Sequence, residues 1–221
     1  MSYTIAVAQR KGGVGKTTVA VSVAAELCRR GKEVAMIDAD PQRSACQWAE
    51  PGTLKFPVYE IALSDQNATN WFRELNHVAA KYGCVIVDTA ASEHALSTSI
   101  AVASLVLVPC TPSGLDLEAT VRTLEIIDSV RARRQGHPSL ILVPNRVDIR
   151  TLEGQQIVAE LTGFGEVVGT ALGDRSAFVR AFSAGKSVAD MPEGLLAHRE
   201  IQLLCNLIEK TLDAIPYRSE N

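Results

Sequence analysis

A run of glycines and lysines near the N-terminus limits the fold of this chain more than any other feature of its sequence. The apolar segment Tyr3–Ala8 leads directly into Gln-Arg-Lys-Gly-Gly-Val-Gly-Lys-Thr-Thr, residues 9–18, and a segment with helical periodicity follows. Glycines let successive backbone N–H groups turn toward phosphate oxygens, and the first turn of a helix adds the positive end of its dipole. A strand, this loop and a helix in that order predict a phosphate-binding α/β domain.

The rest of the chain alternates short apolar runs with longer amphipathic ones. Strands are predicted at Tyr3–Ala8, Glu33–Ile37, Phe56–Ile61, Cys84–Val87, Leu105–Pro109, Leu140–Val143 and Glu166–Val168. Helices are predicted at Lys16–Arg30, Thr69–Lys81, Leu115–Arg134, Thr151–Leu161, Ser176–Ala184 and Leu195–Ile215. This alternation predicts a P-loop α/β fold, with a single doubly wound, mostly parallel sheet and helices on both faces. With 47% apolar but only 5% aromatic residues, the core should be aliphatic, in one domain spanning residues 1–221.

Composition excludes several classes of protein. No run of 18 apolar residues and no basic-then-apolar leader occur, so we expect a cytoplasmic protein without a membrane span. The five cysteines have no CxxC spacing and are expected to be buried free thiols rather than metal ligands or disulfides. The net charge is −3, so any contact with nucleic acid requires a local basic patch.

Individual residues of the loop have separate predicted roles. Lys16 is placed to neutralise the β- and γ-phosphates, and the Thr17 hydroxyl to ligate Mg²⁺. The predicted nucleotide-binding residues are Gly12, Gly13, Val14, Gly15, Lys16, Thr17 and Thr18. A standard P-loop has glycine five residues before Gly15, where this chain has Arg10, and a second lysine, Lys11, begins the glycine run.

This form of the loop resembles the deviant Walker A motif of the ParA/MinD family of ATPases. Val34–Gln42 resembles the second motif of that family, Cys84–Thr89 its Walker B strand, and Val108–Asp116 its proline-containing segment. The resemblance covers nearly the whole chain and is most specific up to Asp88. In size and motif spacing, the chain is most similar to the short ParA-type plasmid-partition ATPases. The resemblance implies ATP or ADP and Mg²⁺ as ligands, and a homodimer that forms with ATP.

Three aspartates end apolar strands and are candidates for hydrolysis. Asp38 and Asp40 follow one strand, and their alternation allows both side chains to face the phosphates, while Asp88 ends another. By resemblance, Asp40 positions the attacking water, Asp38 supports the Mg²⁺ shell and Asp88 holds Mg²⁺ through water. The alternative is that Asp40-Pro41 only ends the strand and begins a turn.

The resemblance also gives Lys11 a role. In that family the first lysine reaches across a dimer interface to the phosphates of the partner's nucleotide, which makes Lys11 catalytic together with Lys16 and Asp40. A second cation makes the closed dimer depend on the state of the nucleotide. A surface lysine beside Arg10 is the alternative.

The base pocket is predicted at Pro144–Asp148, after a strand. Asn145 resembles the base-reading asparagine of related ATPases, while Asp148 resembles the guanine-reading aspartate of GTPases. We favour adenine because the other motifs indicate ATP. A plain turn residue is the alternative for Asn145. By weaker analogy, the Met191–Gly194 turn is expected to supply a second wall.

A DNA-partition ATPase is the favoured function. Its ATP dimer would bind non-specific DNA and associate with the nucleoid, and a centromere-binding or adaptor protein would stimulate hydrolysis. The candidate DNA contacts are Arg175, Arg180, Lys186 and Arg199, and a second basic cluster contains Arg131, Arg133, Arg134 and His137. Either group is otherwise a solvated face.

Three alternatives share parts of this pattern. Cargo-positioning ATPases have the same motifs. A MinD-like membrane switch requires a basic amphipathic C-terminal helix, but the apolar stripe of Glu200–Leu212 suits packing on the domain and its polar face is not basic, so no membrane contact is expected. The third alternative is an enzyme that uses this fold for reductive or ligase chemistry. An iron-protein-like reductase needs two cysteines per subunit at a cluster site, and only Cys110 is even loosely placed for one.

Overall fold

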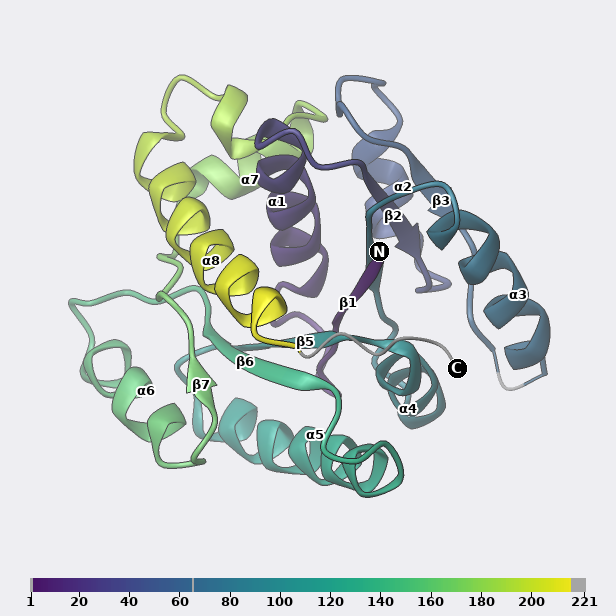
Figure 1. Ribbon diagram of the computed structural model, residues 1–221. Helices are drawn as coiled ribbons and strands as arrows, with labels where there is room; N and C mark the ends of the chain where they lie inside the picture. Colours follow the sequence, from purple (N-terminus) through teal and green to yellow (C-terminus); the bar gives the residue numbers. More distant parts are fainter. Residues whose placement is uncertain (1, 65, 216–221) are drawn as a thin grey trace.

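The computed structural model describes residues 2–64 and 66–215, and within them seven parallel strands form one sheet (Figure 1). The strand order across the sheet is β3-β2-β4-β1-β5-β6-β7. The strands are β1 (Tyr3–Val7), β2 (Val34–Asp38), β3 (Val58–Glu60), β4 (Cys84–Asp88), β5 (Leu105–Cys110), β6 (Ser139–Pro144) and β7 (Val167–Val168). All six strand pairings are parallel, so the predicted α/β sheet is confirmed.

Helices cover both faces of the sheet. They are α1 (Lys16–Arg29), α2 (Ser44–Ala49), α3 (Ala68–Ala79), α4 (Glu93–Val102), α5 (Gly114–Arg133), α6 (Leu152–Thr162), α7 (Ser176–Ser183), α8 (Leu195–Asp213) and the short 3₁₀ helix η1 (Val188–Asp190). On one face α1, α2, α7 and α8 share a core cluster with the strands. On the other, α3 to α6 pack in two clusters. The fold is therefore doubly wound, as predicted.

The position of each strand explains its composition. Strands β1, β2, β4 and β5 have neighbours on both sides and helices on both faces, and nearly all of their side chains are buried. Such strands are continuous apolar runs, which made them visible in the sequence. At the two edges, β3 and β7 are short and partly exposed, and the predicted Phe56–Ile61 run is reduced to three residues.

Two helices were not predicted. α2 has only six residues, too short for a helical period to be recognised. α4 has an N-cap at Ser92, whose side chain accepts a hydrogen bond from the Ala95 N–H, but it packs against both the sheet and α5. A helix buried on more than one side has no clear polar face, so its amphipathic signal is weak.

The helical period in the sequence predicts an apolar stripe on α5 made of Leu117, Val121, Leu124, Ile127 and Val130. One member of this stripe is misassigned. Ile127 is buried as expected, but Val121 is 41% exposed. The inner positions nearest the start of the helix are instead three polar residues, which are Asp116, Thr120 and Thr123. These follow the same spacing of three or four residues and lie on the helix beside Leu117, Leu124 and Val130, which are partly buried and pack against the core as predicted. The helical period was therefore recognised, and only Val121 of the stripe falls outside the buried face. This polar face lies against the loop that follows β1.

The C-terminal helix α8 packs along α1. Its apolar residues Ile201, Leu204, Ile208 and Leu212 are buried in the same cluster as α1, as the sequence predicts. Across the contact, buried Glu26 of α1 bonds to Nε2 of His198 at 2.8 Å, and the Arg30 guanidinium contacts the Glu209 carboxylate at 2.6 Å. Pro216–Asn221, the end of the expected tail, lie outside the described residues.

All five cysteines are free, with Cys84, Cys110 and Cys205 buried and Cys28 and Cys46 half-buried. Burial was therefore overestimated for two of them. Among the described residues, no helix is long and apolar enough to cross a membrane.

Candidate functional site

The loop at residues 9–15 leaves β1 at the carboxyl edge of the sheet, between the ends of β4 and β5. Gly13 and Gly15 have φ values of 80° and 91°, a left-handed conformation that favours glycine. A Cβ at Gly15 would also lie 2.3 Å from Nδ2 of Asn145. Glycine at position 15 is therefore required both by the backbone and by the neighbouring side chain.

Helix α1 begins at the end of this loop with Lys16 and Thr17. Lys16 is buried, and its ammonium donates to the carbonyl oxygen of Lys11 at 3.2 Å. Burial lowers the pKa of Lys16, while the nearby carboxylates of Asp88 and Asp40 act in the opposite direction. A desolvated cation at a helix N-terminus favours a strongly anionic ligand, such as a polyphosphate.

Asp88 and Thr17 form the centre of the site. The Thr17 hydroxyl donates to Oδ2 of Asp88 at 2.6 Å, while buried Oδ1 has no partner within the described chain. Burial, together with the charge of Asp38, raises the pKa of Asp88 to about 7 against the opposing Thr17 hydrogen bond. Oxygen ligands next to excess negative charge are the donor set that Mg²⁺ prefers, and a bound cation would favour the ionised form. These residues therefore fit the predicted Mg²⁺ site.

Asp38 and Asp40 differ in their surroundings. Asp38 pairs in register with Asp88 on the adjacent strand, and its two carboxylate oxygens accept from the backbone N–H groups of Cys46 at 2.9 Å and Asp40 at 3.2 Å. Asp40 lines the main cavity, and its Oδ1 accepts from the N–H of Gln42 at 2.9 Å. Asp38 thus fixes the segment that carries Asp40. A contact between Asp38 and the Mg²⁺ shell stays a prediction.

Lys11 contacts the first turn of α5. Its ammonium forms an ion pair with Oδ1 of buried Asp116, and the Thr111 hydroxyl donates to Oδ2 of the same carboxylate. Nearby, Nε2 of Gln9 donates to Oγ1 of Thr120 at 3.0 Å, and Oγ1 of Thr123 donates to Oε1 of Gln9 at 2.6 Å. The polar face of α5 therefore holds the first half of the loop.

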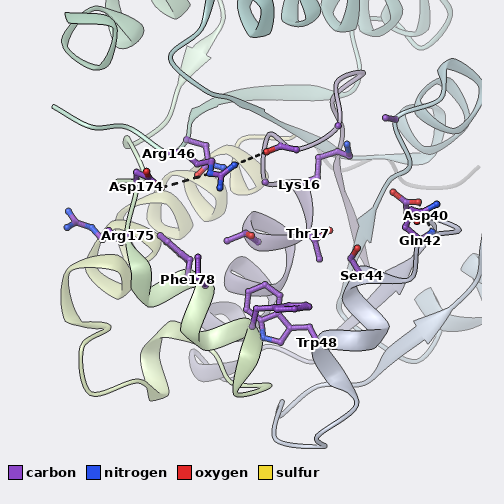
Figure 2. A pocket seen from close by; sticks show the side chains of 18 of the residues that line it. Lys16, Thr17, Asp40, Gln42, Ser44, Trp48, Arg146, Asp174, Arg175 and Phe178 are labelled. Atoms are coloured by element: carbon purple, nitrogen blue, oxygen red, sulfur yellow. Dashed lines mark hydrogen bonds and ion pairs between the residues drawn. The ribbon is translucent and has the colours of Figure 1, made fainter. Parts of the chain in front are cut away.

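A cavity of about 690 Å³ extends from the loop to α2 and α7, as Figure 2 shows. The loop and Thr17 line one part of it, and Asp40 lies near Gln42 and Ser44 in another. The remaining wall includes the aromatic side chains of Trp48, Phe178 and Phe182, and Trp48 meets Phe182 edge to face at 5.4 Å. A polar end with glycines and an apolar end with aromatic rings suit a ligand that has both a polyphosphate and a planar base.

Asn145 and Arg146 attach the end of β6 to the loop. Nδ2 of Asn145 donates to the carbonyl oxygen of Val14 at 2.7 Å, and Nη1 of Arg146 donates to that of Gly13 at 3.2 Å. Arg146 also lies 4.0 Å from the Asp174 carboxylate, as the dashed lines of Figure 2 indicate. Hydrogen bonds from Arg150 lower the pKa of Asp148 to about 2, so this carboxylate is engaged by Arg150.

Residues 5–188 match the sequence profile of the CobQ/CobB/MinD/ParA nucleotide binding domain, which is well over half of the chain. The chain belongs to this family. The loop, the Asp88 strand and the cavity therefore lie in a nucleotide-binding domain of the ParA/MinD type.

Relatives of the chain share nearly its full length. It is 29% identical over 211 residues to maintenance of carboxysome distribution protein A from Halothiobacillus neapolitanus, covering 93% of this chain and 95% of the relative. It is 31% identical over 192 residues to protein ParA of Rhizobium radiobacter, covering 85% of each. A solved ATP complex of a variant of McdA from Cyanothece has a TM-score of 0.74 at 16% identity, covering 99% of both chains, and shows the same fold.

In this ParA/MinD-family chain, the four candidate DNA contacts are in different states. The guanidinium of Arg175 is bound to both carboxylate oxygens of Glu200, and its side chain points away from Lys16 in Figure 2. Arg180 pairs with Glu193 at 2.9 Å. Lys186 and Arg199 are exposed and have no ion pair with any described residue. DNA contact by these residues stays a prediction.

Two arginines of the second basic cluster, Arg131 and Arg134, form contacts within the protein. Arg131 forms ion pairs with Glu166 and Asp128, and Arg134 donates to the carbonyl oxygen of Ala103 at 2.7 Å. Arg133 is exposed. The structure therefore makes Arg131 and Arg134 less suitable for a ligand than their spacing in the sequence indicated.

Sequence reasoning missed several residues that line the main cavity. Trp48 and Phe178 were unmarked because an isolated aromatic residue has no local pattern that identifies it as part of a cavity. The Met191–Gly194 turn, expected as a second wall, does not line the cavity, whereas residues 173–175 do. Asp116 lay inside a segment recognised by resemblance, but its contact with Lys11 spans 105 positions.

Proposed function

We propose that this protein is a Mg²⁺-dependent ATPase, converting ATP and water to ADP and phosphate, that dimerises with ATP and drives the partition of plasmid or chromosomal DNA. The observation that supports it most is the convergence of Lys16, Thr17, Asp88 and Asp40 at one edge of the sheet. The proposal treats residues 1–221 as one domain and places the protein in the cytoplasm, on the nucleoid when bound to ATP.

Each residue has a defined part in the proposed hydrolysis. Bound Mg²⁺ supplies positive charge that offsets the charge on the phosphates. The backbone N–H groups of the loop and the ammonium of Lys16 hold the β- and γ-phosphates. Thr17 and Asp88 provide the oxygens that fix the cation. Asp40 has Oδ1 anchored on the N–H of Gln42, which leaves Oδ2 without a partner among the described residues to orient a water.

Asn145 supports adenine as the base. Because the carbonyl oxygen of Val14 can only accept, the amide nitrogen of Asn145 must face it. The remaining atom, Oδ1, is an acceptor with no partner in the described chain. An acceptor selects the exocyclic amino group of adenine over the carbonyl of guanine. The binding of Asp148 by Arg150 removes the acidic group that a guanine site would require.

A dimer is proposed to form through the face that carries Lys11. Large apolar side chains are exposed there at Leu115, Ile149 and Leu152, next in sequence to residues around a second cavity that contains Lys11. Exposed apolar groups of this size indicate an interaction site. A partner protein, centromere-binding or adaptor, is proposed to stimulate hydrolysis by this dimer.

Non-specific DNA is proposed to bind the dimer through Lys186 and Arg199, with Arg180 in support. Each contact with a phosphate contributes weakly, so one subunit binds poorly at physiological salt. Two patches on a rigid dimer strengthen binding by ~10²-fold or more. ATP would thus control DNA binding through dimerisation.

The test is a salt titration of fluorescent duplex DNA binding with a non-hydrolysable ATP analogue and with ADP. Binding should require the ATP analogue, be insensitive to DNA sequence, and weaken when Lys186 and Arg199 are both replaced by alanine. Arg133→Ala, which removes an equally exposed cation elsewhere, is the matched control. Absence of analogue-dependent binding at low salt would falsify the DNA proposal, and a larger effect of Arg133→Ala would move the DNA face to the end of α5.

The positioning of a protein cargo is the second candidate function. It is supported by the relative from Halothiobacillus neapolitanus, which is named for carboxysome distribution and covers 93% of this chain. Both candidates use the same switch. Binding of the purified ATP dimer to the product of the neighbouring gene, either a centromere-binding protein or a cargo adaptor, distinguishes them.

A further inference from the structure

The contact between Lys11 and Asp116 is built by residues from three separate segments. Asp116 lies in the first turn of α5, where the positive end of the helix dipole stabilises its charge. Its side chain is 4% exposed, and its two oxygens are occupied by Lys11 and Thr111. Lys11, in contrast, is 37% exposed. A fixed, buried anion therefore holds a cation that solvent and other molecules can reach.

Hydrogen bonds to its neighbours fix the position of Asp116, so it cannot move with the side chain of Lys11. The Thr120 hydroxyl donates to the backbone carbonyl oxygen of Asp116 at 2.8 Å, and Thr120 accepts from Gln9 at 3.0 Å. The N–H of Arg10 donates to Oε1 of Gln9 at 2.8 Å. Asp116, Thr120, Gln9 and the backbone N–H of Arg10 thus form one polar network at the start of the loop. Lys11 is the mobile member, since its four-carbon side chain can swing without disturbing the rest.

The pair is also accessible to a second subunit. Lys11, Thr111 and Asp116 line a cavity of about 440 Å³, which they share with Gly12, Arg146 and Asp148. A triphosphate presented to this cavity would offer the ammonium more negative charge than one carboxylate does. Lys11 cannot satisfy both anions at once if they lie on opposite sides of the interface.

We propose that Asp116 is a positioning residue that holds Lys11 within its own subunit and competes with the nucleotide of the partner subunit for that ammonium. This rests on the cross-subunit role of Lys11 in the proposed function. Each dimer breaks two such pairs when it closes. Asp116 therefore weakens the dimer and makes its formation depend on a ligand with enough charge to displace a carboxylate.

The first measurement needs no dimer. The nucleotide-free protein is labelled with acetic anhydride, and the modification of each lysine is followed by peptide mass spectrometry. Because the contact with Asp116 holds the Lys11 ammonium against the protein and restricts its access to the reagent, Asp116→Asn should increase the labelling rate of Lys11 severalfold relative to Lys186 in the same chain. Glu118→Gln, which removes an exposed carboxylate from the same helix, should leave the rate unchanged. An unchanged rate in Asp116→Asn overturns the proposal.

The second measurement is the dimer dissociation constant by analytical ultracentrifugation with adenylyl imidodiphosphate. A partly exposed ion pair contributes about threefold, so loss of two should tighten the Asp116→Asn dimer roughly tenfold. Thr111→Val should act in the opposite direction, since it leaves Asp116 with Lys11 as its sole side-chain partner. A merely structural defect would weaken the dimer in both variants, and that result overturns the proposal.

The two measurements separate failure of this inference from failure of the proposed function. If the wild-type protein stays monomeric with the analogue, the proposed ATP-dependent dimer is wrong. The proposed competition for Lys11 then fails as well. If wild type dimerises and Lys11 labels faster in Asp116→Asn, but the dimer constant does not change, the pair exists without regulating the dimer. Binding of ADP to each variant should stay within about twofold of wild type, because Asp116 lies outside the cavity that holds the nucleotide of its own subunit.

Discussion

The hydroxyl of Thr17 donates a hydrogen bond of 2.6 Å to Oδ2 of Asp88, which leaves Oδ1 of this buried carboxylate without a partner in the described chain. The bond joins the first turn of α1 to the end of β4, two elements on either side of the loop. A buried acceptor without a partner is costly unless a ligand satisfies it. This contact therefore joins the start of the proposed phosphate site to the carboxylate proposed to hold Mg²⁺.

Replacement of Asp88 by asparagine should therefore weaken Mg²⁺ binding. We expect the Mg²⁺ concentration for half-maximal ATPase activity to rise by roughly 10- to 100-fold. The amide keeps the shape of the carboxylate, so the fold should persist by circular dichroism. Activity that saturates at the wild-type Mg²⁺ concentration would exclude Asp88 from the metal site.

Lys16→Ala should remove nucleotide binding. The substitution deletes a buried cation that opposes several phosphate charges, and a loss of affinity of about 100-fold or more is expected. Isothermal titration calorimetry with ATP measures it, with Lys186→Ala as an exposed-lysine control. Equal affinities for wild type and Lys16→Ala would show that the phosphates bind elsewhere.

Asp40→Ala should separate binding from turnover. Among the described residues, Asp40 has no hydrogen bond or ion pair with the loop, so ATP affinity and dimerisation should stay close to wild type. Loss of the group that orients water should lower kcat by roughly 10²- to 10⁴-fold. The measurement is phosphate release under single-turnover conditions. Turnover at the wild-type rate would assign the water to another residue.

Asn145→Ala should reduce the preference for ATP over GTP. The substitution removes the Oδ1 acceptor and also the bond to Val14, and the latter loss affects both nucleotides equally. The ratio of the two affinities should therefore fall by about tenfold, as one hydrogen bond is lost for adenine alone. A competition assay with both nucleotides gives this ratio directly, and a constant ratio would place base recognition elsewhere in the cavity.

Glu26→Ala should destabilise the fold without touching the cavity. Glu26 is buried and bonds to His198 at 2.8 Å and Arg30 at 2.9 Å, so its loss removes the carboxylate that His198 contacts and one of the partners of Arg30 in the α1–α8 contact. We expect the free energy of unfolding in urea to fall by about 2–3 kcal/mol. Glu118→Ala on the exposed side of α5 should change it by less than about 0.5 kcal/mol.

The predicted site residues that the structure brings together are those marked by a local signal in the sequence. Lys16 and Thr17 are identified by glycine spacing, and Asp88 by its place at the end of an apolar run. The strands at the centre of the sheet were predicted for the same reason, since burial on both faces makes a strand apolar throughout. The edge strands β3 and β7 were predicted but are shorter than expected, and the buried helix α4 lacks such a signal.

The residues that were missed are those whose contacts join distant segments. Asp116 meets Lys11 across 105 positions, and Trp48 reaches the carbonyl oxygen of Lys186 across 138. Their partners depend on how the helices pack on the sheet. Asp38 shows the other limit, because strand alternation predicted a side chain facing the phosphates but did not reveal that backbone N–H groups engage both its oxygens.

The packing of α8 on α1 gives the molecule a mechanical coupling. α1 begins at Lys16, where the phosphates are proposed to bind. It ends near Arg30, which forms an ion pair with Glu209 of α8. Arg199, a proposed DNA contact, lies one residue from His198, which holds Glu26. With the two helices fastened at both His198 and Glu209, α8 cannot slide along α1 unless these bonds break. If the protein binds a polymer through Arg199 as proposed, these contacts would transmit a force on α8 to the helix that begins at the proposed phosphate site.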